Sequence, residues 1–456
     1  MTNTRLFTLI ILIALLPLRL IAAIDMQAHV GSDEGKKAYT TYTTKQTNYY
    51  TGTYTYASLI ALKNDELFGR INTLMGNTAF TTGKSFSYGN LSTNYGPVDT
   101  DLNNKDNIIL FYNGASVSST WDSGNTFNKE HVWPQSFGAP DSRPMGYDMQ
   151  AVRPCNPSIN SSRNAQGYAE TIDNAYTYIP DASYRGDCAR IIMYDYLTYG
   201  KAGNYYNKYY KEGEADLFNE FGTSEHKIFE SLRIMLKWHM QDPPSLTEMV
   251  RNDGAQNYQG NRNPLIDYPE LAIQVFLEDI KELEGITTYT VTESSAATMW
   301  PAHQYTLSDG FIAYLTNDNG THPAEIKVTG AATYTYNASL GRLTVSEVTG
   351  NMTISDVAGS TPDPDPDPEP DPATFTVTWM ANGAVHHTAT YNTNGSENIK
   401  LPAAPTACDG YTFVGWTTEA NYSNPFCAPE DLLTSDTQQK PKVTSNLTYY
   451  AVFKKD

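Results

Sequence analysis

The stretch Asn128–Glu170 decides the fold and the chemistry of this chain. It begins NKEHVWPQSFG, and from Tyr147 onward it reads YDMQAVRPCNPSINSSRNAQGYAE. The adjacent Glu130 and His131 would point to opposite faces of a strand, but at a strand end or a bulge both can border one cleft. A carboxylate together with an amide oxygen suits a hard divalent cation such as Mg²⁺. A neutral imidazole suits removal of a proton from water near neutral pH.

Three arginines follow within this stretch, Arg143, Arg153 and Arg163. Each guanidinium is a planar donor whose geometry matches the oxygens of a phosphate group. One metal ion, one general base and nearby arginines are sufficient for hydrolysis of a phosphodiester. Glu-His is a common dipeptide, so the pattern becomes specific only together with the motifs around it.

Length, composition and net charge limit the classes of protein to which this chain can belong. At 456 residues the chain has room for two or three domains, and 40% hydrophobic residues are enough for packed cores. It has 31 basic and 50 acidic residues, a formal net charge of −19. This excess of negative charge excludes a protein that coats nucleic acid electrostatically, as histones do. It leaves room for an enzyme with a small, local basic cleft.

The N-terminus has the pattern of an export signal. Arg5 precedes the apolar run Leu6–Leu16, and the small residues Ala22 and Ala23 follow. This order predicts a secretory signal peptide over residues 1–23, because the run is too short for a membrane span. No other long apolar stretch follows. We therefore expect a mature chain without a membrane span that is secreted, periplasmic or held at the cell surface.

Patterning along the chain predicts an α+β fold and three structured regions. Residues 24–285 show helical periodicity, and Asp267–Glu270 resembles a capping box with proline just inside a helix. Residues 286–360 alternate in the manner of strands. Residues 361–373 include TPDPDPDPEPDP, where alternating proline and acid blocks both helix and sheet and predicts an extended spacer. Residues 374–456 again read as strands.

The four cysteines fall into two pairs that are far apart in sequence. In an oxidising compartment, Cys155 could bond to Cys188 and Cys408 to Cys427. The alternative is that the thiols are unpaired and buried. The chain has no CxxC motif, which disfavours a zinc site built from cysteines.

Several of these motifs, taken in order, resemble the bacterial endonuclease I family. They are NKEHVWPQSF, DMQAVRP and INSSRN, and GNRNPLIDYPELA at Gly260–Ala272 resembles the usual C-terminal segment of that family. The resemblance covers roughly residues 50–285, and the set is far more specific than any one motif. It implies an α+β nuclease domain with a His-Me finger, or ββα-metal, site in mainly helical surroundings, followed here by two small all-β modules.

The resemblance assigns roles to three residues by position. His131 matches the general base, and Glu130 and Asn160 match the metal ligands. In the family fold His131 would end a strand of a β-hairpin, and Asn160 would lie on the helix that follows. The ion implied is Mg²⁺, with Mn²⁺ or Ca²⁺ as substitutes.

The arginines are harder to assign. Arg163 lies one turn beyond the metal-ligand asparagine, where it could support the helix, bridge to a carboxylate or contact phosphate. Arg143 is the first candidate for the arginine that stabilises the transition state, and Arg153 is the second. Many relatives have histidine where this chain has Gln150, which can form hydrogen bonds but cannot gain a proton, so a supporting role there stays open.

The C-terminal region resembles the InlB B-repeat, or Listeria–Bacteroides repeat. The segments that carry the resemblance are GYTFVGWTT at Gly410–Thr418 and NLTYYAVF at Asn446–Phe453. Such units are small β folds of surface and secreted proteins without a catalytic constellation. Tyr411 and Trp416 either belong to the core of the unit or form a ligand patch. The β modules are accordingly candidates for contact with a cell surface or a polysaccharide.

The sequence thus predicts a secreted, metal-dependent endonuclease. We expect a monomer that hydrolyses phosphodiester bonds of DNA, and of RNA as well, to 5′-phosphate products with little sequence specificity. The alternative is a surface binding or adhesion protein whose nuclease-like domain is inactive, which the β modules and the spacer favour. The intact Glu130, His131 and Asn160 argue against it. A secreted metalloprotease is a weaker alternative, because the chain has no HExxH segment.

Overall fold

The computed structural model describes most of the chain between residues 32 and 455. The described residues are 32–137, 139–170, 177–200, 231–278, 280, 287–293, 297–317, 320–356, 374–392, 398–418, 432–434, 443 and 447–455. The predicted signal peptide and the predicted proline-acid spacer lie outside these ranges. Helices and sheets occur together, so the expected α+β class is confirmed.

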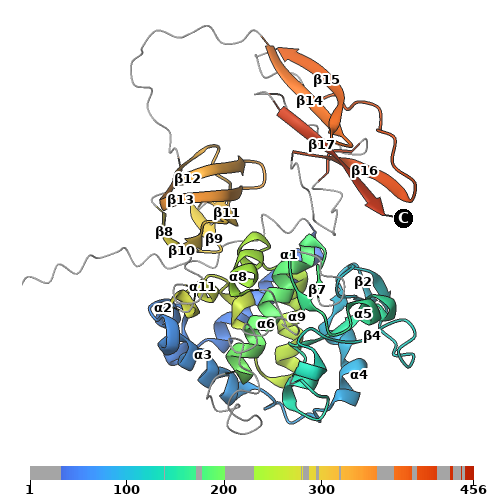
Figure 1. The fold of residues 1–456 in the computed structure, drawn as a ribbon, viewed down its shortest axis with the longest axis vertical. Helices are drawn as coiled ribbons and strands as arrows, with labels where there is room; N and C mark the ends of the chain where they lie inside the picture. Colours follow the sequence, from blue (N-terminus) through green and yellow to red (C-terminus); the bar gives the residue numbers. More distant parts are fainter. Residues whose placement is uncertain are drawn as a thin grey trace, which may run out of the picture.

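The helices form the main body of the molecule (Figure 1). Helix α6 (Arg185–Tyr199) lies at its centre, and every residue from Gly186 onward is buried. It packs against α3 (Asn64–Thr78), α8 (Leu232–Gln241) and α10 (Pro264–Asp267). The remaining helices of the described residues are α1 (Asp33–Tyr49), α2 (Tyr56–Ile60), α4 (Tyr88–Val98), α5 (Pro157–Arg163), α9 (Leu246–Gln259) and α11 (Leu271–Val275). None of the described helices is both long and apolar enough to cross a membrane.

The stretch Asn128–Glu170 forms a hairpin followed by a helix. Strand β4 (Asn128–His131) pairs antiparallel with β5 (Val152–Cys155), with Glu130 opposite Arg153. Helix α5 begins directly after β5, because the Asn156 side chain accepts hydrogen bonds from the second and third helical N–H groups and proline fills the first position. The neighbouring sheets are β1 (Thr100–Asp101), β2 (Asn104–Ile109) and β3 (Ser116–Ser118), and β6 (Gly167–Tyr168) with β7 (Thr177–Tyr178).

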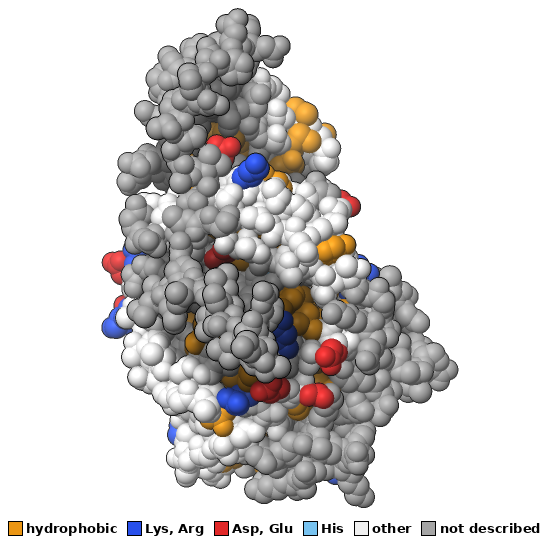
Figure 2. Space-filling model, turned by 90° about the vertical axis from the view of Figure 1, so that its left-hand side faces the viewer, with side chains coloured by type: hydrophobic (Ala, Val, Ile, Leu, Met, Phe, Trp, Pro, Cys, Tyr) orange, Lys and Arg blue, Asp and Glu red, His pale blue; other side chains and the backbone are white. Residues whose placement is uncertain are grey.

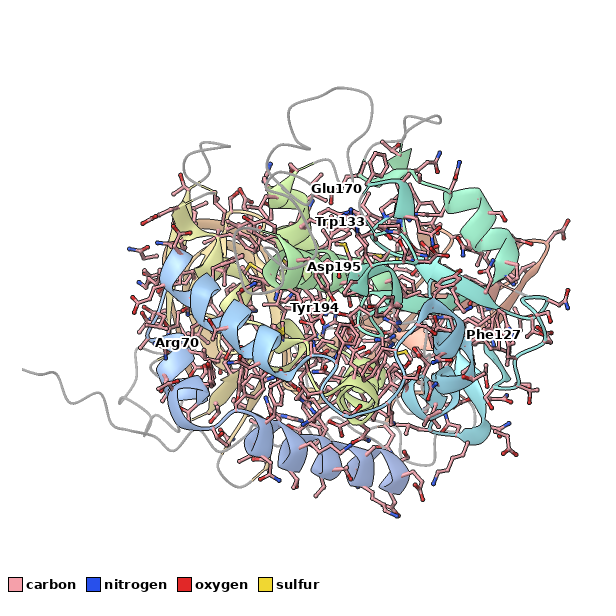
Figure 3. The ribbon with its side chains drawn as sticks, turned by 90° about the horizontal axis from the view of Figure 1, so that it is seen from below. Arg70, Phe127, Trp133, Glu170, Tyr194 and Asp195 are labelled. Carbon is pink, nitrogen blue, oxygen red and sulfur yellow. The ribbon has the colours of Figure 1, made fainter. Side chains whose placement is uncertain are left out.

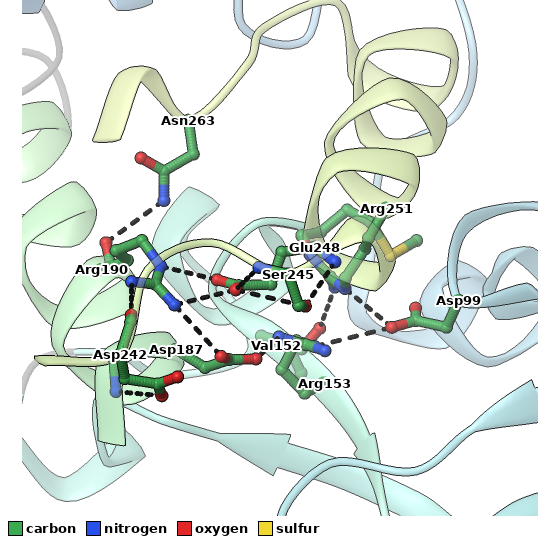
Figure 4. Close-up of polar contacts among 12 residues, drawn as sticks. Asp99, Val152, Arg153, Asp187, Arg190, Asp242, Ser245, Glu248, Arg251 and Asn263 are labelled. Atoms are coloured by element: carbon green, nitrogen blue, oxygen red, sulfur yellow. Dashed lines mark hydrogen bonds and ion pairs between the residues drawn. The ribbon is translucent and has the colours of Figure 1, made fainter. Parts of the chain in front are cut away.

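Buried ion pairs fix strand β5 to the helices (Figure 4). Arg153 on β5 lies 3.5 Å from Asp99 and 3.9 Å from Asp187. Arg251 on α9 also binds Asp99, at 2.7 Å, and it donates to the carbonyl of Val152 at 3.2 Å. Because these groups are buried, removing one partner would leave a charge without compensation. The network therefore determines where the second strand of the hairpin lies.

A third arginine extends the same network. The guanidinium of Arg190 on α6 donates to both carboxylate oxygens of Glu248, at 2.7 and 2.8 Å. It also donates to Asp187 at 3.2 Å and to the carbonyl of Asp242 at 2.6 Å. Glu248 in turn completes a capping box with Ser245 at the start of α9. One bidentate ion pair thus joins α6 to the first turn of α9.

Residues 288–356 form a six-stranded sheet that packs against the helices (Figure 1). Strand β11 contacts α8, and Arg233 pairs with Asp309 at 2.9 Å. Buried apolar side chains of this sheet and of the helices belong to one continuous cluster. The strand order is β10 (Tyr305–Leu307), β8 (Thr288–Glu293), β13 (Arg342–Asp356), β11 (Phe311–Thr316) and β9 (Thr298–Trp300), with β12 (Ile326–Asn337) paired to β13. The predicted boundary near residue 285 therefore separates two kinds of secondary structure that share a core.

Residues 374–455 contain a four-stranded sheet with a core of its own. Trp379 and Trp416 lie inside that core with their ring centroids 5.0 Å apart, whereas Tyr411 is 44% exposed. Of the two readings of Trp416, the structure supports a core residue. The order is β15 (Ala384–Asn392), β14 (Thr374–Ala381), β17 (Leu447–Lys455) and β16 (Tyr411–Thr417).

The expected disulfide between Cys155 and Cys188 is wrong for this structure. Both are buried free thiols, and the Cys155 thiol lies 3.5 Å from the carbonyl oxygen of Asn156. Both side chains are members of the large apolar cluster, so packing accounts for their burial without a covalent bond. Cys408 is also a free thiol, and its expected partner Cys427 lies outside the described residues.

Candidate active site

His131 ends strand β4 with its ring in the interior. The side chain is 8% exposed, and Nε2 lies 3.0 Å from the carbonyl oxygen of Gly146. A carbonyl oxygen can only accept, so Nε2 carries the proton and Nδ1 is left as the basic nitrogen. Burial lowers the pKa of His131 to about 4. The imidazole is therefore neutral near pH 7, as a general base must be.

Two neighbours hold the imidazole in this orientation. The ring of Tyr88, at the start of α4, stacks on it with centroids 5.5 Å apart and planes inclined by 23°. Gly146 belongs to the short 3₁₀ helix Pro144–Tyr147, and a Cβ at this position would lie 2.1 Å from the carbonyl oxygen of Pro140. The carbonyl that binds His131 can be presented there only by glycine.

Glu130 is 1% exposed and held through one of its two oxygens. The hydroxyl of Tyr112 donates to Oε1 at 2.8 Å, and Nη1 of Arg163 lies 3.3 Å from the same atom. Burial raises the pKa of Glu130, while Arg163 and Tyr112 oppose that rise. None of the described residues donates a hydrogen bond to Oε2. This oxygen is available to a ligand.

Asn160 on α5 points its amide nitrogen toward β4. Nδ2 donates to Oδ1 of Asn128 at 2.8 Å and to the carbonyl of Lys129 at 3.2 Å. Both amide hydrogens are thus used, and Oδ1 is left to accept. One carboxylate oxygen and one amide oxygen form a donor set that fits a hard divalent cation. Within the described part of the chain, no group of three or more His, Cys, Asp or Glu side chains could hold a metal ion.

Arg163 supports the hairpin from inside. Its guanidinium is 1% exposed and donates to the carbonyls of His131 and Val132, each at 2.8 Å, besides its ion pair with Glu130. Its charge lies 4.9 Å from the ring centroid of Tyr168. Of the roles that the sequence left open, the geometry favours the bridge to a carboxylate over a direct phosphate contact.

The other two arginines differ in position. Arg153 is buried, and its charge is balanced by the carboxylates of Asp99 and Asp187. Arg143 is half-buried and directly precedes the 3₁₀ helix that carries Gly146. The assignment of Arg143 as the first candidate and Arg153 as the second stays a prediction.

Some contributors had no signal in the sequence. Tyr112 binds Glu130 from a loop position with a φ of 70°, which is uncommon outside glycine. Gln150 is buried and donates to Asn252 on α9 at 2.8 Å, so it braces the segment before β5. Trp133 donates from its indole nitrogen to the carbonyl of Phe137 at 2.7 Å and packs inside the molecule (Figure 3).

The part of the chain that carries this site matches known proteins. Residues 65–270 match the family model described as Endonuclease I. The chain is 31% identical over 192 residues to an extracellular ribonuclease of Bacillus subtilis (strain 168), and 30% identical over 192 residues to an extracellular ribonuclease of Bacillus amyloliquefaciens. Each alignment covers 39% of this chain and 64% of the relative. The segment with β4, β5 and α5 lies within the residues that match the Endonuclease I model, and part of the chain is similar to extracellular ribonucleases.

Proposed function

We propose that this protein is a secreted, metal-dependent endonuclease of the endonuclease I family. It hydrolyses phosphodiester bonds of RNA and DNA with little sequence specificity and leaves 5′-phosphates. The observation that carries the proposal is a neutral, buried His131 at the end of β4. Glu130 on the same strand and Asn160 on α5 each keep one oxygen for a ligand. The succession β4–β5–α5 serves as a His-Me finger. The relatives named extracellular ribonucleases support RNA as a substrate.

His131 acts as the general base. Its Nδ1 takes a proton from the attacking water, while Nε2–H stays bonded to the Gly146 carbonyl and fixes the tautomer. The low pKa of His131 keeps the ring neutral over most of the pH range. The stacked ring of Tyr88 prevents rotation of the imidazole away from the water. Positioned proton transfer of this kind contributes roughly 10² to 10⁴ in rate.

Glu130 and Asn160 would hold the divalent ion through Oε2 and Oδ1. Mg²⁺ fits two oxygen donors and water, and Mn²⁺ or Ca²⁺ can replace it. When bound, the ion supplies positive charge for the scissile phosphate and the leaving 3′ oxygen. Arg163 favours the ionised form of Glu130, because its guanidinium opposes the rise in pKa that burial causes. Arg143 is the arginine proposed to contact the phosphate in the transition state.

The two sheets beyond the helices have separate roles in this proposal. Residues 288–356 complete the core of the catalytic body. Residues 374–455, with their own core, hold the enzyme at a cell surface or on a polysaccharide. The enzyme acts as a monomer. Figure 2 shows basic and acidic side chains interspersed among the described residues of one face.

Cleavage assays with and without chelator test the function. The protein is incubated with supercoiled plasmid and, separately, with RNA, in Mg²⁺ or in EDTA. We expect cleavage of both substrates in Mg²⁺ and none in EDTA, with circular dichroism unchanged because no structural metal is proposed. An intact protein that binds nucleic acid but cleaves neither substrate in Mg²⁺ would support the alternative of an inactive binding protein.

Calorimetric titration with Mn²⁺ tests the ligand assignment independently of activity. We expect Glu130→Ala to weaken binding more than Asn160→Ala, because it removes the only charged ligand. Asn125→Ala is the control, since Asn125 is exposed and bonds only to Asp122 of its own turn, and it should bind as the wild type does. Unchanged affinity and stoichiometry in both ligand variants would place the ion elsewhere.

A further inference from the structure

Lys129 lies on the same face of β4 as His131. The two residues are separated by one position, so their side chains project to the same side of the strand. The Lys129 ammonium lies 4.0 Å from the ring centroid of Tyr88, and the same ring stacks on His131 with a centroid distance of 5.5 Å. Together these two distances place the ammonium within about 9.5 Å of the imidazole centre.

Two aromatic rings hold this ammonium in place. Besides Tyr88, the ring centroid of Trp121 lies 4.9 Å from Nζ. Trp121 itself packs edge-on against the fully buried Phe127, at 5.3 Å. The faces of both rings are electronegative and attract a cation. The lysine is therefore preorganised rather than free to move with its flexible stem.

This ammonium has no acceptor in the described part of the chain. Lys45, Lys105 and Lys237 all pair with a carboxylate, whereas Lys129 makes neither an ion pair nor a hydrogen bond with any described oxygen. Its three N–H groups are strong donors, and partial burial penalises a charge that stays unpaired. In a chain with a net charge of −19, a half-buried lysine without a carboxylate partner among the described residues has the chemistry to bind an anion.

We propose that Lys129 binds a non-scissile phosphate next to the phosphodiester whose hydrolysis by water His131 assists as the general base. This inference rests on the proposed function and names a second contact of the same site. Neighbouring phosphates of one strand can span the distance between the imidazole and the ammonium. Tyr88 acts as a positioning residue for both, because one ring orients the base and the lysine. The contact strengthens binding of the nucleic acid and determines which of its phosphates lies next to His131. It does not take part in the proton transfer.

Lys129 could instead act on His131 itself. A cation nearby lowers the pKa of the imidazole, and Lys129 contributes in that direction. The two roles differ in what they change. A phosphate contact changes KM and its dependence on salt, whereas an electrostatic effect on the base shifts the acid limb of the pH profile.

The test compares Lys129→Met with Lys105→Met on a short RNA and a single-stranded DNA, over a range of salt concentrations. Lys105 is exposed and paired with Glu34, so it is the matched control. For Lys129→Met we expect KM to rise roughly tenfold, as for one charge-assisted hydrogen bond, with kcat nearly unchanged. The slope of log KM against log salt should fall by about 0.7. Lys129→Arg should restore most of the loss.

An oligonucleotide with one neutral methylphosphonate gives a second readout. In the wild type, cleavage next to the neutral linkage should be slower than elsewhere, and Lys129→Met should abolish this difference. An unchanged KM and salt slope in a folded Lys129→Met would overturn the proposal, as would a shifted pH profile with KM unaffected. Failure of the proposed function itself is distinguishable, because the wild type would then cleave no unmodified strand.

Discussion

Replacing Arg163 with methionine tests the contact on which the candidate site is built. Methionine fills a similar volume without a charge or a donor. The substitution leaves Glu130 buried without its guanidinium, and the carbonyls of His131 and Val132 without their donors. Breaking a buried ion pair by removing one partner costs about 3–5 kcal/mol. We expect a loss of this size in the free energy of unfolding at pH 7.

The loss should depend on pH in a defined direction. Burial already raises the pKa of Glu130, and without Arg163 it rises further. A carboxyl group with a raised native-state pKa favours the native state when protonated, so this stability is lost as pH rises through that pKa. The penalty in Arg163→Met should therefore be full at high pH and shrink as pH falls toward the unfolded-state value, about 4.3 for glutamate.

Urea denaturation of Arg163→Met and of Glu130→Gln/Arg163→Met between pH 5 and 8 measures both effects. The double variant has no Glu130 carboxylate to bury. The difference in unfolding free energy between the double and the single variant should therefore shrink as pH falls. A penalty below about 1 kcal/mol in the single variant at pH 7 would refute the reasoning. So would equal pH dependence in the two variants, because the buried carboxylate would then not be the source of the cost.

Two further outcomes follow from the fold and from the base. His131→Ala should lower kcat by a factor of roughly 10² to 10⁴, while metal affinity is retained. The acid limb of the wild-type rate profile should have its midpoint near pH 4, because burial lowers the pKa of His131 to about that value. Steady-state rates across pH measure both effects, and a midpoint near the ordinary pKa of histidine would contradict the effect of burial. Deletion of residues 374–456 should leave the thermal unfolding midpoint and the cleavage rate unchanged. Deletion of residues 286–456 should lower the unfolding midpoint by roughly 4 °C or more, because it exposes the apolar cluster shared with α8. Calorimetric scans of both truncated proteins measure the two midpoints.

The local part of the site could be predicted from the sequence, and the long-range part could not. The hairpin and helix of Asn128–Glu170 follow from a contiguous stretch with its own helix cap at Asn156. Tyr112 binds Glu130 across 18 positions of sequence, and no local pattern marks it. The same limit applies to Arg153, whose partner Asp187 comes from a helix after β5.

One helix start shows how a buried ion pair overrides a capping pattern. Asp267–Glu270 resembles a capping box, but the carboxylate of Asp267 binds Arg262 through two hydrogen bonds of 2.8 Å. Helix α11 then begins at Leu271 without a side-chain cap. The capping box of this region lies instead at Ser245, at the start of α9. A buried guanidinium competes successfully for a carboxylate, because its desolvation is the larger cost.

The ion pair between Glu130 and Arg163 also affects how binding of the divalent cation depends on binding of the nucleic-acid substrate. The guanidinium already balances the one negative charge that the proposed ligand set offers. A divalent cation between Glu130 and Asn160 would therefore bring an excess of about two positive charges, with Lys129 close by, unless an anion arrives with it. Phosphate oxygens are such an anion. Metal affinity and substrate affinity should thus rise together by the same factor, so that an enzyme released into dilute surroundings becomes loaded mainly where nucleic acid is present.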